Sequence, residues 1–537
     1  MTAPSTSMLL VPKASRLTGF LVAFLREKGF EPFVLSTAPA DGGAAFARMC
    51  AELDVAHAVS GSVALSSAEV LERVAALPEL VFCFTVADGL RHAMAVANHA
   101  IGAHDVSPDA ALLALDKHLM RRRLAERGLT RLRPFLLSDP ELRARLDRGE
   151  RHIVKPRRGA ASLCTRAVTS WEEVTAQLAD FERGSDADDQ WGEFFTGNEL
   201  VAETFFDGSE LSFELLRQDG RTVLAVEHEK PELEFTAHTV LERGFVSPAV
   251  FLSPAQLAAA RECTEAGLDA LGLHDGCYHV ELRVDERCAC EIVEVNPRVG
   301  GSMLYESVLT QFERSLGHDW VDTIVGKPLP PTAGDRRCGI YLQNQYPEPG
   351  RQVLAIVADP RLPEPAQFSR VFGPGRIARA DRADRAATAM WKTELADHRE
   401  TVAGLVGHRY ASFVYAKGLT GRPLFLVFEP TAATLPLIER ADRDGHDVVV
   451  FHTGPLPDEN PDALGAVAAS HALDSWADAG SCADRIVAAC AGHEVAGSHC
   501  KHEPAAAAHR VARERLGLAP DAADTADTAD TADAVTA

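Results

Sequence analysis

The stretch Glu291-Ile-Val-Glu294-Val-Asn296-Pro-Arg298-Val-Gly300-Gly301 carries the strongest signal in the chain. Glu294 and Asn296 are two residues apart on a predicted strand, so their side chains emerge on one face. A carboxylate and an amide oxygen placed there can share a hard cation such as Mg²⁺. Arg298 follows at the strand end, and paired glycines allow the backbone to approach a ligand closely. A solvated edge strand would explain the polar triplet alone, but the surrounding apolar residues and the Gly-Gly pair favour a metal site.

A hairpin is predicted to bring a second carboxylate to this face. Residues 276–285 and 288–295 have the pattern of its two strands, with carboxylates at alternating positions among Val, Leu and Ile. Glu281 lies thirteen residues before Glu294 on the other arm, where cross-strand pairing would place it in the same metal cluster. His279 would share the face of Glu281.

Other patterns divide the chain into parts. Apolar runs alternating with helical periodicity over residues 8–106 predict a doubly wound parallel sheet. One charged amphipathic helix is predicted from Ser107 to Gly128. Strands at 152–156, 199–206 and 209–217, the last two flanking the turn Asp207-Gly208, indicate an antiparallel α+β region. A helix is expected at 254–272, and a small β-rich module at 331–415.

The opening of the chain repeats near its end. Met8-Leu-Leu-Val aligns without a gap with Leu424-Phe-Leu-Val, and Gly29 aligns with Gly445, at an offset of 416 residues. We therefore predict a second strand-helix-strand unit at 421–518. The Thr-Ala-Asp repeats that follow contain no large apolar residue, which predicts a disordered tail.

Composition narrows the functional classes. The formal net charge is −23, which argues against nucleic acid or an anionic membrane surface as a partner. The 11 cysteines follow no disulfide or zinc pattern, which fits reduced thiols in the cytoplasm. The apolar patch from Phe20 to Leu25 is interrupted well before membrane-spanning length. His493, His499, Cys500 and His502 cluster without ligand spacing, and a loop with incidental histidines explains them better than a metal site.

From about residue 8 to 330 the sequence resembles the ATP-grasp superfamily. Asp116-Lys117 resembles the first phosphate lysine of that family, and Ile153-Val-Lys155-Pro-Arg-Arg-Gly-Ala-Ala-Ser162 resembles the lid lysine and its phosphate loop. Glu203-Thr-Phe-Phe-Asp-Gly-Ser-Glu210 is similar to the hinge, with one acid near adenine and the next on the ribose. Lys230 is similar to a third phosphate cation. One departure is Cys164, which stands where the family commonly has glycine.

The resemblance implies an ATP-grasp fold of mixed α/β and α+β parts. The expected parts are an N-terminal parallel-sheet domain (1–110), an ATP-grasp domain (111–330) with its lid at 135–205 and its metal core at 206–330, a β-rich module (331–415), a Rossmann-like half-repeat (416–518) and the tail (519–537). In the half-repeat, Ala505 and Ala506 replace Asp116 and Lys117 at an offset of 389, so we expect no ATP chemistry there.

The resemblance also implies roles for individual residues. ATP would be bound by Lys117, Lys155, Ser162, Glu203, Glu210 and Lys230, and two Mg²⁺ or Mn²⁺ ions by Glu281, Glu294 and Asn296. Substrates would contact His279, Arg298, Gly300 and Gly301. Lys155 and Arg298 would be catalytic, with Arg298 and the glycine amides stabilising the oxyanion that forms when an amine attacks an acyl phosphate.

The resemblance implies an ATP-dependent carboxylate–amine ligase that acts on small molecules and releases ADP and phosphate. It also allows a homodimer. The segment Ala237 to Pro248 looks most like the branch that joins amino acids into dipeptides, including L-amino-acid ligases and carnosine-synthase-like enzymes. The alternatives are a ligase or carboxylase for a non-amino-acid carboxylate, and a non-catalytic nucleotide-binding scaffold.

Overall fold

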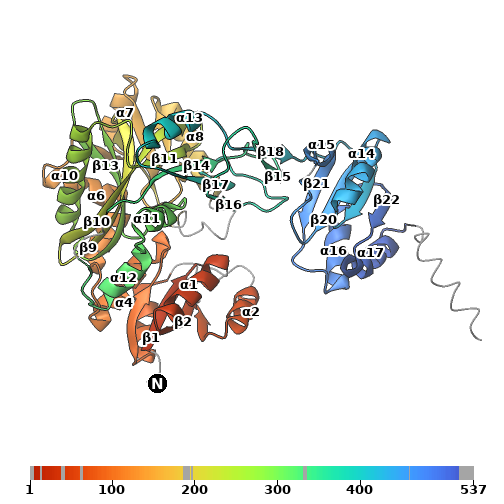
Figure 1. Ribbon diagram of the computed structural model, residues 1–537, viewed down its shortest axis with the longest axis horizontal. Coiled ribbons are helices and arrows are strands. Elements are labelled where there is room, and N and C mark those ends of the chain that lie inside the picture. The colour runs from red at the N-terminus through yellow and green to blue at the C-terminus, as the bar shows by residue number, and fades with distance from the viewer. Residues whose placement is uncertain are drawn as a thin grey trace, which may run out of the picture.

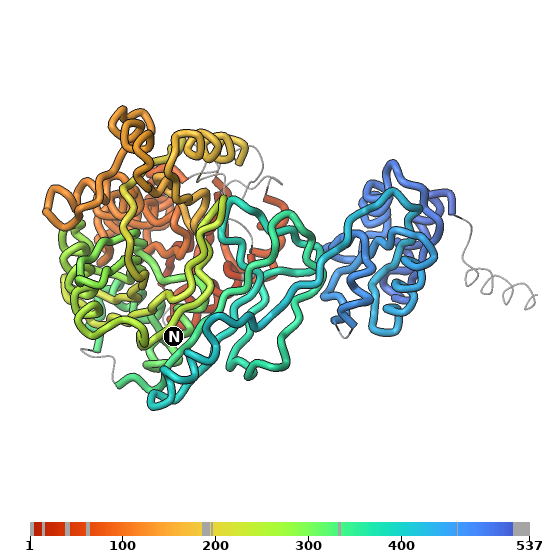
Figure 2. The backbone as a smooth tube through the Cα atoms, turned by 90° about the horizontal axis from the view of Figure 1, so that it is seen from above, coloured from red at the N-terminus to blue at the C-terminus, as the bar shows by residue number. Residues whose placement is uncertain are grey.

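The computed structural model describes residues 5–518, apart from 13–14, 38–42, 61–64, 185–193, 195–196, 331–334 and 459. A large body built from most of the chain and a smaller C-terminal body, coloured blue, are visible in Figures 1 and 2. Among the described residues, no helix has both the length and the apolar character needed to cross a membrane. The predicted disordered tail lies outside the described residues.

The N-terminal sheet is parallel, with strand order β3-β2-β1-β4. Its elements are β1 (Ser5–Val11), α1 (Arg16–Glu27), β2 (Phe30–Ser36), α2 (Ala44–Glu52), β3 (His57–Val59), α3 (Ser67–Ala76), β4 (Leu80–Phe84), the short helix η1 (Asp88–Leu90) and α4 (Arg91–Ile101). The run from Met8 to Val11 in β1 is fully buried, as a central parallel strand requires. The predicted parallel sheet is confirmed.

The single helix predicted from Ser107 to Gly128 is wrong. The chain forms two helices, α5 (Pro108–Leu115) and α6 (Lys117–Glu126), separated at Asp116. The Asp116 backbone is extended, and its side chain accepts a hydrogen bond from the Leu119 amide at 3.0 Å, which caps α6. The break places Lys117 in the first turn of α6, where its backbone amide donates to the Arg157 carbonyl at 3.0 Å.

A four-stranded antiparallel sheet of order β5-β8-β6-β7 follows. It comprises β5 (Pro134–Leu136), α7 (Pro140–Leu146), β6 (His152–Pro156), β7 (Arg166–Val168), α8 (Trp171–Gly184) and β8 (Leu200–Thr204), and we call it the lid sheet. Phe135, Val154 and Ala202 belong to its own hydrophobic core. The turn Asp207-Gly208 therefore does not join a hairpin, because β8 lies in the lid sheet and the next strand lies in another sheet.

The central sheet has eight strands in the order β13-β12-β9-β10-β11-β14-β17-β16, and its neighbours are antiparallel. The strands are β9 (Ser209–Gln218), β10 (Arg221–Phe235), β11 (Val240–Ser247), β12 (Gly276–Val284), β13 (Cys290–Asn296), β14 (Gly339–Gln345), β16 (Gln367–Arg370) and β17 (Ala387–Thr393). The helices are α10 (Pro254–Leu271), α11 (Leu304–Phe312), α12 (Leu316–Ile324) and α13 (His398–Leu405). The hairpin at 276–295 and the helix at 254–272 are confirmed.

The stretch 331–415 is rich in strands and is joined to the central sheet. β14 pairs with β11 from Gly244↔Gln343 to Ser247↔Ile340, so three of its strands continue the central sheet. Only β15 (Val353–Ala358) and β18 (Ala411–Tyr415) form a separate two-stranded sheet. The side chains of 331–415 can therefore reach the same cavity as those of the hairpin.

The C-terminal unit has the topology of the N-terminal one. Its parallel sheet has the order β21-β20-β19-β22, the same as β3-β2-β1-β4. Its elements are β19 (Leu424–Phe428), η2 (Ala432–Thr434), α14 (Leu435–Arg443), β20 (Asp447–His452), α15 (Pro461–Gly465), β21 (Val467–Ala472), α16 (Ala479–Ala489), β22 (Val495–Cys500) and α17 (Glu503–Arg515). The predicted second strand-helix-strand unit is present. Leu354 and Ala355 of β15 share a hydrophobic core with it, which attaches it to the large body.

Candidate active site

Two cavities meet in the large body. The larger, of about 740 Å³, is lined by α1, the loop before η1, the residues after β13 and the segment 383–385. The smaller, of about 90 Å³, lies between the lid sheet and the central sheet and is lined by Lys117, Lys155, Glu203 and Glu210. Ser162, Glu242, Glu281 and Glu294 line both cavities. These four side chains form what we call the shared wall.

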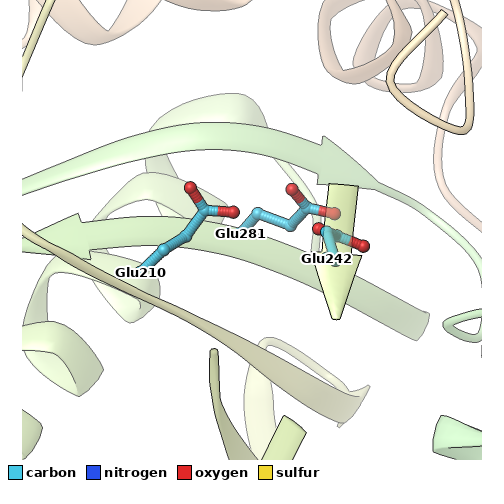
Figure 3. Close-up of side chains that lie close together, drawn as sticks. All are labelled: Glu210, Glu242 and Glu281. Carbon is cyan, nitrogen blue, oxygen red and sulfur yellow. The ribbon is translucent and has the colours of Figure 1, made fainter. Parts of the chain in front are cut away.

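Three carboxylates gather beside this wall from three strands of the central sheet. Glu210 on β9, Glu242 on β11 and Glu281 on β12 offer oxygens that all lie within 4.8 Å of one another. Figure 3 shows these three side chains close together. The Lys230 ammonium contacts all three carboxylates, Glu210 at 3.1 Å and Glu281 at 3.3 Å. Glu242 was not anticipated as part of this group.

The electrostatics of this group fit a divalent cation. Burial, together with the nearby charges of Glu281 and Glu210, raises the pKa of Glu242 even though Lys230 acts to lower it. Glu281 and Glu210 each have a second cation, His279 and Arg283, both at 2.9 Å. Among the described residues Glu242 pairs with Lys230 alone, so it is the carboxylate with capacity for an added cation. Carboxylate oxygens are the hard ligands that Mg²⁺ prefers, so this donor set suits such an ion.

The predicted hairpin brings the predicted metal residues together on adjacent strands. In the β12–β13 register Glu281 lies opposite Glu294, and His279 lies opposite Asn296. Glu294 also lies 3.1 Å from the Lys117 ammonium, whose Nζ donates to the Gly159 carbonyl at 3.3 Å. Asn296 is buried in the lining of the larger cavity. The assignment of Glu281, Glu294 and Asn296 as metal ligands stays a prediction.

The smaller cavity contains a buried chain of charges. The Lys155 ammonium lies 2.9 Å from Glu203, whose carboxylate also accepts hydrogen bonds from Arg121 at 3.2 and 3.3 Å. Burial alone would raise the pKa of Glu203, but Arg121 and Lys155 lower it to about 2. Burial lowers the pKa of Lys155 despite the Glu203 charge. In this structure Glu203 forms ion pairs with both cations. Its expected contact with adenine stays a prediction.

The loop before β7 has the conformation of a glycine-rich turn without the glycines. Ala161, Ser162 and Cys164 adopt φ values of 51°, 52° and 45°, in the left-handed region that glycine favours. Cys164 is fully buried, and its amide donates to the Asp381 carbonyl at 2.6 Å. The substitution of glycine by Cys164 therefore keeps the turn, and a second contact, from the Ala383 amide to the Ala161 carbonyl at 3.0 Å, fastens the loop to the segment before β17.

The Gly300 amide donates to the Glu214 carboxylate at 2.9 Å, so it already has an acceptor in this structure. Its predicted contact with a substrate oxyanion stays a prediction. Glu214 also bonds to His279 Nδ1, and His279 Nε2 lies 2.9 Å from Glu281. Burial acts to lower the pKa of His279, but Glu214 and Glu281 raise it to about 10. The His279 ring is therefore a cation at neutral pH that orients Glu281 at the shared wall.

Arg298 is fixed by a residue that the sequence did not single out. Its Nε and Nη2 donate to the two Asp88 oxygens at 2.6 and 2.5 Å, and its Nη1 donates to the Val299 carbonyl at 2.7 Å. Asp88 belongs to η1 of the N-terminal unit. Each terminal nitrogen of Arg298 keeps one further N–H group that can face the larger cavity, which both residues line.

The comparisons with known proteins agree on the fold. Residues 149–306 match the family described as the ATP-grasp domain. This chain contains an ATP-grasp domain. No curated protein matches the sequence.

Solved structures extend the similarity beyond the matched domain. L-amino acid ligase from Bacillus licheniformis superposes with a TM-score of 0.58 at 16% identity, covering 78% of this chain and 100% of that one. The biotin carboxylase domain of 2-oxoglutarate carboxylase from Hydrogenobacter thermophilus gives 0.55 at 12%, covering 76% and 91%. Phosphoribosylglycinamide synthetase from Anaerococcus prevotii gives 0.52 at 14%, covering 76% and 99%. At these identities the likeness establishes the ATP-grasp fold, and the expected fold class is confirmed.

Several residues of the ATP-grasp domain that contact the site escaped the sequence analysis. Glu214 is buried on β9 and Glu242 is half-buried on β11, and no recognised motif includes either of them. Arg121 lies among three consecutive arginines of α6, yet only its side chain is fully buried. The one available signal for Glu214 was a carboxylate that stands among apolar residues, on a strand that is buried over nearly its whole length.

Replacement of Gly300 by alanine is expected to disturb the shared wall. A methyl group there would lie 2.5 Å from a Glu214 oxygen and 2.8 Å from Leu304. Overpacking of this kind costs about 1–3 kcal/mol, and moving Glu214 would release His279 and Glu281. We expect a lower melting temperature and reduced nucleotide turnover in the same variant. Gly301→Ala is the matched control, because an added Cβ there meets no atom within 4 Å. Equal melting temperatures for the two variants would contradict this account.

Proposed function

We propose that this protein is an ATP-dependent carboxylate–amine ligase that forms an amide bond through an acyl phosphate and releases ADP and phosphate. The observation that carries the proposal is the shared wall: one set of carboxylates and one loop serine line both a lysine-lined cavity and a larger cavity of about 740 Å³. Cavities of about 300–1,000 Å³ are typical of small-molecule sites. A nucleotide on one side of the wall would present its terminal phosphate to substrates on the other.

The cations of the smaller cavity support a phosphate site. Lys117 and Lys155 approach it from α6 and from β6, and both are buried. Phosphoryl transfer relies mainly on positioning and on neutralising the phosphate oxygens, which buried lysines supply. The smaller cavity, of about 90 Å³, is below the size of typical ligand sites, so nucleotide entry requires the Lys155–Glu203 side chains to rearrange.

The reaction needs no nucleophile from the protein. A carboxylate oxygen of the substrate attacks the γ-phosphorus, the bond to the bridging oxygen breaks, and ADP leaves with that electron pair. The amine then attacks the acyl carbon, phosphate leaves, and the nitrogen gives up one proton. Arg298, held by Asp88, would offer its remaining N–H groups to the oxygen on which negative charge gathers.

A metal site at the wall is part of the proposal. Glu281 and Glu294, with Glu242 or Asn296, would hold Mg²⁺ or Mn²⁺ there. Such an ion neutralises charge on the phosphate oxygens and thereby lets one anion approach another. His279 keeps Glu281 aimed at this position.

Amino acids are the substrates that we propose first. The likeness in fold to L-amino acid ligase supports this choice, as does the resemblance of residues 237–248 to the dipeptide-forming branch. The larger cavity has both apolar surface, from Phe24 and Trp320, and charged groups, which suits amino acid side chains with their polar ends. A non-amino-acid carboxylate remains the alternative substrate, and nucleotide binding without turnover remains the alternative to catalysis.

The test is an ADP-release assay with Mg²⁺-ATP and the twenty amino acids, pooled and then omitted one at a time. Products are identified by mass spectrometry, and Glu294→Ala serves as the catalytic control. Amino-acid-dependent ADP and a new amide, both lost in Glu294→Ala, are the expected result. ADP release that depends on a carboxylate alone would favour a carboxylase or another ligase. Nucleotide binding without turnover over a broad panel of acids and amines would contradict the ligase proposal.

A further inference from the structure

Three arginines line the larger cavity, and they differ in their pairing. Arg298 is paired with Asp88, and Arg376 lies 3.0 Å from Asp384. Arg385, in the segment before β17, forms no ion pair with a carboxylate anywhere in the described part of the chain. Its Nε is buried and has no hydrogen-bond partner.

The Arg385 side chain is nevertheless held in place. Its Nη1 donates to the Ser302 hydroxyl, which also accepts a hydrogen bond from Asn344 at 3.2 Å. The backbone around it is fastened to the lid loop through Ala383 and Ala161. Burial lowers the pKa of Arg385, while Tyr346, Glu242 and Glu306 act in the opposite direction without contacting it. A guanidinium remains protonated in proteins, so this is a positioned cation without a bound anion.

The surroundings of Arg385 favour an anion from a substrate over one from the nucleotide. Arg385 does not line the smaller cavity, where Lys117 and Lys155 lie. The mouth of the larger cavity is apolar instead, because Leu17 and Phe20 of α1 and Val371 line it while being about half exposed. A ligand with an apolar body and a carboxylate at one end would match both features.

We propose that Arg385 binds the spectator carboxylate of a substrate, the carboxylate that is neither phosphorylated nor joined to the amine. The inference rests on the proposed ligase function and deepens it. An incoming amine that carries its own carboxylate, or an acyl donor with a second acid group, meets this requirement, whereas a simple amine with a simple acid does not. A guanidinium donates two parallel hydrogen bonds to a carboxylate, which makes Arg385 a specificity-determining residue.

The experiment changes only a carboxylate that does not react. The amino acid at the amine position is compared with its own carboxamide and its decarboxylated amine, and an acyl donor with a second acid group is compared with the carboxamide of that second group. In the wild-type chain we expect kcat/KM for the carboxylate form to exceed that for the carboxamide by about 10²-fold or more at one of the two substrate positions. Arg385→Gln should bring this ratio close to one and leave the KM for ATP unchanged. Arg385→Lys should restore part of the ratio, since it returns the charge without the fork. Arg376→Gln is the matched control and should keep the ratio, because Asp384 already pairs with its guanidinium.

Two results of the turnover comparison would overturn the inference. The first is that Arg385→Gln leaves the ratio of kcat/KM between the carboxylate and carboxamide forms unchanged. The second is that Arg385→Gln raises the KM for ATP, which would mean that Arg385 binds the nucleotide. A binding measurement separates this inference from the ligase proposal. Trp320 lines the larger cavity, so its fluorescence can report binding of the same amino acids and amides without turnover. A response to the carboxylate forms that Arg385→Gln abolishes would support the anion site even if no amide product formed, and no difference between the forms in wild type would reject it.

Discussion

Replacement of Glu281 by glutamine is expected to lower kcat for ADP release by about 10²- to 10³-fold. Glutamine keeps the size of the side chain and removes its charge at the centre of the shared wall. Glu281 lies opposite Glu294, contacts Lys230 at 3.3 Å and accepts from His279 at 2.9 Å, so its charge pairs with fixed cations and would also bind the proposed metal ion. The measurement is the coupled ADP assay at saturating ATP and substrates, repeated over a range of Mg²⁺ concentrations.

The control for this variant is Glu262→Gln on α10, an exposed acid that lines neither cavity. It should leave kcat and the Mg²⁺ dependence unchanged. The Glu281→Gln protein should show near-normal circular dichroism, because the exchange conserves volume. If kcat stays at the wild-type level in Glu281→Gln, the shared wall is not the reaction centre and the proposed mechanism fails.

Replacement of Glu203 by glutamine is expected to destabilise the lid sheet by about 3–5 kcal/mol at neutral pH. The side chains of Arg121, Lys155 and Glu203 are all at least 95% buried, as exposures of 0%, 4% and 5% show. Removing the carboxylate leaves two cations in a site without solvent. Because the chain has several hydrophobic cores, hydrogen exchange of the β8 amides reports this region better than a global unfolding curve does.

The destabilisation caused by Glu203→Gln should depend on pH. The pKa of Glu203 is lowered in the folded protein to about 2, below its ordinary value of 4.5. A group with a depressed pKa stabilises the fold fully above its unfolded value, and this contribution is lost as the pH falls toward the folded value. The stability difference between wild type and Glu203→Gln should therefore be constant above about pH 5 and shrink toward pH 2. Glu199→Gln is the control. The Glu199 side chain is 51% exposed, so its ion pair with Arg157 should contribute at most about 1 kcal/mol to stability. A constant difference down to pH 2 would contradict the assignment of the effect to the Glu203 charge.

Patterns within short stretches determined most of the fold. Alternation with a period of two predicted the hairpin of β12 and β13, and thus the pairing of Glu281 with Glu294, because side chains on a strand alternate between faces. Apolar runs and glycine positions predicted both parallel sheets, and the 416-residue offset predicted that β19 and β20 would match β1 and β2. The helix break at Asp116 was missed, since helical periodicity continues through it and a capping aspartate also occurs inside helices.

The candidate site was decided largely by tertiary structure. Asp88 and Arg298 are 210 residues apart, Glu214 and Gly300 are 86 apart, and Arg385 reaches Ser302 over 83. A single sequence gives the residue types on each element, and with them the chemistry that a strand can offer. Which buried charge receives a partner, and which is left to bind a substrate, depends on how sheets and loops distant in sequence pack. That packing follows from the total burial of apolar surface and the pairing of buried charges, and no local pattern encodes it.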